Sequence, residues 1–103
     1  MITITGTVGP SGKYLVTGMP VNTKTPAVMK ISFENNTGGT NLELRAGADA
    51  DFATGTGGML LSDSGGPGFR FLTIIDVSLI AGKIIWVHRA VGSAAAAFTL
   101  NIE

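Results

Sequence analysis

The side chains that could carry out chemistry are few in this 103-residue chain. Ser64, in the string Ser-Asp-Ser-Gly-Gly-Pro at positions 62–67, could act as a nucleophile, and the single histidine, His88, could act as its base. A nucleophilic serine needs a base within hydrogen-bond reach and a carboxylate that orients the base. Glycine and proline in a turn explain the same string without chemistry. We therefore expect no catalytic residues and no enzymatic activity.

The string at 62–67 also resembles the Asp-Ser-Gly-Gly-Pro sequence around the nucleophile of chymotrypsin-like proteases. The order of the residues differs, because His88 follows Ser64 here, whereas the histidine precedes the serine in that family. The Ala-Ala-His-Cys motif of the family is missing, and the chain is far shorter than the two barrels that build such a site. The string therefore predicts a turn.

Three aspartates in the glycine-rich segment 48–68 could offer oxygen ligands to calcium: Asp49, Asp51 and Asp63. Calcium takes six to eight oxygens, and the spacing of an EF-hand is absent, so the default expectation is solvated loop carboxylates. A lone histidine cannot build a zinc site, and the chain has no cysteine. We expect no cofactor and no metal, with these three residues as the calcium candidates.

The charge of the chain is low and balanced, with seven basic and seven acidic residues. The basic residues are scattered, whereas nucleic-acid binding needs clustered positive charge that neutralises phosphates. A membrane helix needs about 18 consecutive apolar residues, and no stretch approaches this length. The N-terminal segment lacks the basic and apolar regions of a signal peptide. We expect neither a nucleic-acid nor a membrane partner. The expected location is a virion if the chain is encoded by a phage, and otherwise the cytoplasm.

The hydrophobic pattern indicates strands throughout. Apolar and polar residues alternate with a period of two, and β-branched residues are frequent, as in strands with one wet face. Strands are expected at 1–8, 13–17, 27–34, 41–47, 69–77, 83–90 and 97–103, with a short edge strand at 59–61. No helix of ordinary length fits, although the alanines at 94–97 leave a helical turn or a strand open there. The prediction is one all-β domain over residues 1–103, an antiparallel sandwich of seven or eight strands.

The alternation also predicts which faces are buried. Inward positions are Met29, Ile31, Phe33, Leu42, Leu44, Ala46, Phe98, Leu100 and Ile102, and Asn41, Glu43 and Arg45 are expected to face water. The strands at 69–77 and 83–90 are apolar on both faces. One face of each meets the core, and the other is covered by a loop, by another chain, or by nothing. Trp86 is more often core than an interface anchor. The candidates for a partner interface are Ile84, Ile85, Trp86, Val87, Phe52, Met59 and Leu60.

Three strings follow one known pattern: NLELRAG at 41–47, AGKIIWV at 81–87 and FTL at 98–100. In this order they resemble the bacterial pre-peptidase C-terminal domain, a small jelly-roll-like β-sandwich that lies downstream of secreted proteases. The resemblance implies a jelly-roll-like fold over roughly residues 13–102. Asn41 stands where the family usually has aspartate, and Tyr14 is the sole tyrosine, so the family's metal and substrate contacts are not carried over to particular positions.

Two functions of different kinds fit these observations. The first is a non-enzymatic structural protein, such as a phage capsid decoration (cement) subunit, which buries apolar strand surface against a capsid lattice or in a homo-oligomer. Low charge, 45% hydrophobic residues and 15 glycines favour this function, because such a surface is unusual in a free monomer. The alternative is a binding module of the pre-peptidase type that recognises a polymer or a protein with the help of calcium.

Overall fold

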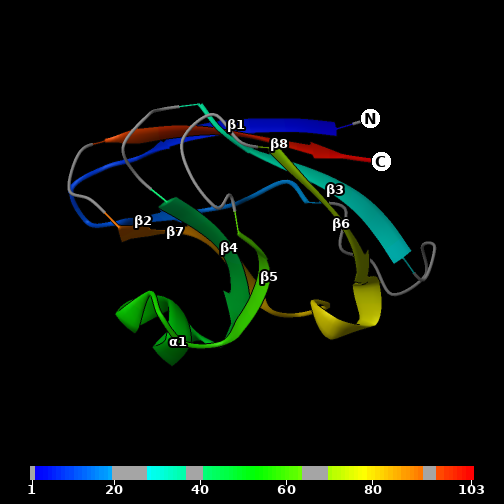
Figure 1. The fold of residues 1–103 in the computed structure, drawn as a ribbon. Helices are drawn as coiled ribbons and strands as arrows, with labels where there is room; N and C mark the ends of the chain where they lie inside the picture. Colours follow the sequence, from blue (N-terminus) through cyan, green and yellow to red (C-terminus); the bar gives the residue numbers. More distant parts are fainter. Residues whose placement is uncertain (1, 20–27, 37–40, 64–69, 92–94) are drawn as a thin grey trace.

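The computed structural model describes residues 2–19, 28–36, 41–63, 70–91 and 95–103. Within them, eight strands form two four-stranded antiparallel sheets, sheet A and sheet B, packed as a sandwich (Figure 1). The strands are β1 (Ile2–Val8), β2 (Lys13–Leu15), β3 (Val28–Asn35), β4 (Asn41–Gly47), β5 (Met59–Asp63), β6 (Arg70–Asp76), β7 (Ile84–Val91) and β8 (Ala96–Ile102). Two short helices complete the described elements, α1 (Asp49–Thr54) and the 3-10 helix η1 (Val77–Leu79).

The order of the strands is that of a jelly roll. Sheet A has the order β1-β8-β3-β6, and sheet B has the order β2-β7-β4-β5. Consecutive strands cross from one sheet to the other, apart from β4 and β5, which are neighbours in sheet B. This arrangement is the eight-stranded double Greek key. The predicted all-β, jelly-roll-like sandwich is therefore confirmed.

The core lies between the sheets and uses the faces that the alternation predicted. Successive side chains of a strand point to opposite faces, so every second residue enters the interior. All nine predicted inward residues are buried: Met29, Ile31, Phe33, Leu42, Leu44, Ala46, Phe98, Leu100 and Ile102. Phe98 lies at the centre of an aromatic group, with ring centroids 5.2 Å from Tyr14 and 6.1 Å from Phe33.

Helix α1 is an element that the sequence pattern did not predict. The glycine content of segment 48–68 indicated little helix, yet residues 49–54 form a six-residue helix. The Asp51 carboxylate accepts a hydrogen bond from the backbone N–H of Ala48 at 3.0 Å, and this satisfies a free amide at the start of the helix. The glycines begin at Gly55, which ends the helix in a left-handed conformation (φ 80°) and donates its N–H to the carbonyl of Asp51.

The structure also decides the alanine segment before the last strand. Ala96 and Ala97 belong to β8, opposite Val8 and Thr7 of β1, whereas Ala94 lies outside the described residues. Strand pairing explains this choice, because Ala96 fills a buried position that a helical turn would vacate.

Candidate functional site

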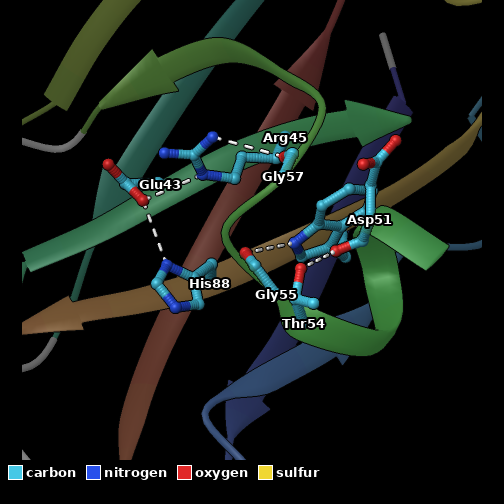
Figure 2. Close-up of polar contacts among 8 residues, drawn as sticks. Glu43, Arg45, Asp51, Thr54, Gly55, Gly57 and His88 are labelled. Atoms are coloured by element: carbon cyan, nitrogen blue, oxygen red, sulfur yellow. Dashed lines mark hydrogen bonds and ion pairs between the residues drawn. The ribbon is translucent and has the colours of Figure 1, made fainter. Parts of the chain in front are cut away.

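A group of interacting polar and aromatic side chains lies on the outer face of sheet B. Two neighbouring rows cross this sheet: Lys13, His88 and Glu43 form one row, and Leu15, Trp86 and Arg45 form the next. Residues 48–58, which connect β4 to β5 and include α1, fold back over these rows and are called the flap here (Figure 2). The flap contacts both β4 and β7.

Trp86 of β7 holds the flap against the outer face of sheet B. Its indole is fully buried, and its Nε1–H donates a hydrogen bond of 3.0 Å to the carbonyl of Gly55. The Phe52 ring of α1 packs edge to face on the indole, with centroids 5.6 Å apart. Buried tryptophans need a partner for the indole N–H, and the flap backbone supplies it.

Lys13 holds the helical part of the flap from the neighbouring strand. Its Nζ donates to the carbonyl of Ala53 at 2.7 Å and lies 5.1 Å from the centroid of the Phe52 ring. The ammonium group thus satisfies a carbonyl that the short helix leaves without an internal partner. Such a cation over an aromatic face adds a further favourable interaction.

Glu43 is the ionic centre of the group. Its Oε1 accepts a hydrogen bond from Nε of Arg45 at 3.0 Å and lies 3.0 Å from Nδ1 of His88 (Figure 2). Arg45 also donates from Nη1 to the carbonyl of Gly57 at 3.4 Å. Burial raises the pKa of the Glu43 carboxyl, but hydrogen bonds from Arg45 and His88 and their charges outweigh burial, so the pKa lies below 4.5.

Two glycines of the flap lie close to their neighbours and have a positive φ, which disfavours larger residues there. A Cβ on Gly55 would lie 3.1 Å from Cδ2 of His88 and 3.1 Å from Cδ of Lys13. Gly58 has a φ of 74°, and a side chain there would overlap the carbonyl oxygen of Ala46. These contacts explain why the segment is rich in glycine: its backbone lies directly on sheet B.

The pair His88–Glu43 has the form of a base with an orienting carboxylate, the arrangement that a serine nucleophile requires. Ser64, the nucleophile considered from the sequence, lies outside the described residues. In the described structure the pair serves the flap, because Glu43 also binds Arg45, which reaches the Gly57 carbonyl. Asn41, Glu43 and Arg45 were expected to face water: they lie on the outer face of β4, as the alternation predicted, but they are partly buried, and the side chains of Glu43 and Arg45 are only 14% and 16% exposed.

The residues considered for a partner interface are distributed over three environments. Ile85 and Val87 belong to the core, and Trp86 lies under the flap, so these three side chains are covered by their own chain. Phe52 packs on Trp86, Met59 packs against the core, and Ile84 is partly buried. Leu60, at 47% exposure, is the one member of the set with a largely open side chain. Of the covers considered for the outer face of β7, the structure thus places the chain's own flap over Trp86.

The calcium candidates do not come together into one set of ligands. Asp51 caps α1, Asp49 is exposed in the first turn of that helix, and Asp63 lies in β5 opposite Glu43. Among the described residues, no three or more His, Cys, Asp or Glu side chains form a group that could hold a metal ion.

A second surface feature lies on the other sheet. Three large apolar side chains are more than half exposed at the corner where β3 begins and β6 runs into η1: Val28 (53%), Ile74 (67%) and Leu79 (51%). These three residues are called the apolar corner. The sequence pointed to it through Ile74, since the strand at 69–77 is apolar on both faces, whereas Val28 and Leu79 gave no separate signal.

Within the described segments, no helix has the length and apolar character needed to cross a bilayer. The chain matches no protein-family model, no curated protein and no solved structure.

Proposed function

We propose that this protein is a non-enzymatic assembly protein, a decoration (cement) subunit of a phage virion that attaches to the capsid lattice through exposed apolar surface. The observation that carries the proposal is the apolar corner, because large exposed apolar side chains on adjoining elements favour burial against a partner. Its location would then be the virion.

The geometry of the corner suits a rigid contact. Val28 lies opposite Asp76 and Lys30 lies opposite Ile74, so Val28 and Ile74 are diagonal neighbours on the outer face of sheet A. Their neighbours Met29 and Ile75 are buried in the core, which holds the two strands in place. An attached partner therefore meets preformed apolar surface and spends little conformational entropy on ordering it.

The low charge of the chain supports the same function. Seven positive and seven negative charges cancel, and only 14% of the residues are charged, so copies packed densely on a lattice repel one another little. Jelly rolls occur in many capsid proteins, and the fold is compatible with this role, but the corner carries the proposal because folds host many functions.

The test is binding to undecorated capsids of the phage that encodes the chain, measured by co-sedimentation and by the melting temperature of the capsid. The wild-type protein should co-sediment and raise that temperature. Ile74→Asp should weaken binding by about tenfold to a hundredfold, since burial of an isoleucine is worth about 1.5–3 kcal/mol. Leu60→Asp, an equally drastic change at an exposed position of sheet B, is the matched control and should bind like the wild type.

Circular dichroism melting of each variant shows whether the fold is retained. The proposal is wrong if the wild-type protein leaves capsids unbound at micromolar concentration, or if both variants bind as the wild type does.

A further inference from the structure

In the described part of the chain, the two sheets end in four edge strands: β1 and β6 in sheet A, and β2 and β5 in sheet B. An edge strand presents unpaired N–H and C=O groups that would accept a strand from another chain. Soluble proteins block such edges with very short strands, charged residues, prolines or bulges. Each edge of this protein can therefore be compared with those devices.

Three of the four edge strands have at least one of these protective features. Strand β2 has three residues and includes Lys13. Strand β5 ends with Asp63, and its pairing with β4 shifts register between Leu44 and Arg45. Strand β6 ends with the charged residue Asp76. These edges are protected against pairing.

Strand β1 has none of these protective features. Its seven residues, Ile-Thr-Ile-Thr-Gly-Thr-Val, include no charge and no proline, and all seven pair with β8 in one unbroken register. Gly6 is explained by packing, because a Cβ there would lie 2.5 Å from Cζ of the Tyr14 ring. An edge strand of this length without protection is a site for strand addition.

We propose that β1 pairs antiparallel with β1 of a second copy of this chain, joining the two A sheets across a twofold axis at Thr5. In this register Thr5 faces Thr5 of the other copy, Thr3 faces Thr7, Ile4 faces Gly6 and Ile2 faces Val8. The exposed threonines of one copy then face threonines of the other copy. On the core-facing side, Ile2 and Ile4 face Val8 and Gly6. Cross-strand threonine pairs stabilise antiparallel sheets, and Ile2, now 40% exposed, gains a neighbour.

The self-complementary register is the reason to choose a second copy as the occupant. A twofold contact requires each residue to meet its symmetric counterpart, and the alternation Thr3, Thr5, Thr7 is symmetric about its centre. The pairing goes beyond the proposed capsid attachment and does not depend on it, because β1 and β6 are opposite edges of sheet A. A dimer joined at β1 leaves the apolar corner open.

The experiment measures molar mass by sedimentation equilibrium for the wild type and for two charge variants at the twofold axis. The wild type should form a dimer with a Kd of micromolar order, as expected for a small interface. Thr5→Lys and Thr5→Glu each place two like charges opposite one another, so each alone should raise the Kd at least about tenfold. An equimolar mixture of the two variant chains should form a heterodimer, since a lysine then faces a glutamate.

Ile74→Lys is the matched control, because it adds the same charge at the exposed opposite edge of sheet A and should leave the dimer intact. Recovery in the mixture also shows that both variant chains are folded. A monomeric wild type at several hundred micromolar, dimeric single variants, or a mixture that stays monomeric would each overturn the pairing. If the protein binds capsids but stays monomeric, the pairing is overturned and the proposed function stands. If it forms a dimer that does not bind capsids, the proposed function is overturned and the pairing stands.

Discussion

At the scale of single residues, Glu43 shows how one carboxylate connects a strand to the segment above it. It receives hydrogen bonds from Arg45 of its own strand and from His88 of the next strand, and Arg45 extends the connection to the flap. Burial would favour the protonated acid, but these partners favour the ionised form, and the net effect is a lowered pKa.

The lowered pKa predicts how Glu43→Gln changes stability with pH. A group with a folded-state pKa below its unfolded value stabilises the fold while ionised, and this contribution is lost as pH falls through the folded-state pKa. At pH 7 the variant should therefore have a free energy of unfolding about 1–2 kcal/mol below that of the wild type. The difference should shrink as pH falls below 4.5. Urea unfolding between pH 7 and pH 3 measures it.

Glu103→Gln is the control for this prediction, because it makes the same chemical change at an exposed carboxylate. Its difference from the wild type should stay near zero across the pH range. A constant difference for Glu43→Gln down to the lowest pH would contradict the assigned role of the carboxylate.

At the scale of the elements, the flap explains the strand β7 that is apolar on both faces. Ile85 and Val87 enter the core, and the opposite face presents Trp86 to Phe52 and to the Gly55 carbonyl. The flap is a short helix with a glycine-rich return, and its attachment depends on a small number of contacts to sheet B. Removal of one of them should loosen the whole segment.

Phe52→Ala tests this dependence with Trp86, the single tryptophan of the chain, as the reporter. Loss of the ring should expose the indole to water, shift its fluorescence to longer wavelength and increase quenching by acrylamide. The free energy of unfolding should fall by about 1–3 kcal/mol, less than for a phenylalanine at the centre of a core. Leu60→Ala truncates an exposed apolar side chain of β5 and should leave the spectrum unchanged. Equal spectra for Phe52→Ala and the wild type would rule out the flap as the cover of Trp86.

At the scale of the whole molecule, the jelly roll joins the two ends of the chain. Strand β1 pairs with β8, so that Ile2 lies opposite Ile102, and β8 in turn lies between β1 and β3 (Figure 1). Most strand pairs in both sheets likewise connect segments far apart in the sequence. Forming such nonlocal contacts requires the chain to close long loops. The loss of chain entropy comes before the contacts stabilise the fold, and this slows folding.

Refolding should therefore take milliseconds to seconds rather than microseconds. Stopped-flow dilution from urea, followed by the fluorescence of Trp86, measures the rate, because the indole is fully buried in the native protein. The measurement needs several protein concentrations, since a phase that depends on concentration reports dimerisation rather than folding. A refolding phase complete within microseconds would contradict the nonlocal topology.

What could be predicted from the sequence follows from local rules. Alternation with a period of two places strands and assigns their buried faces, because side chains of a strand alternate whatever its partners are. The nine inward residues of β3, β4 and β8 were predicted for this reason, and the structure confirms them. Helix α1 was missed because its stability comes from one capping carboxylate and from packing on Trp86, and neither leaves a periodic pattern.

The sequence by itself therefore determined that the chain is an all-β sandwich and which side of most strands is apolar. Only the tertiary structure decided what covers the second apolar face of β7, since that depends on the flap reaching Trp86 across 31 residues of sequence. It also placed Glu43 with His88, assigned Ile74 to an open face and made β1 an edge strand. These features depend on which strands become neighbours, and pairing between distant segments is set by the packing of the whole sandwich rather than by any local pattern.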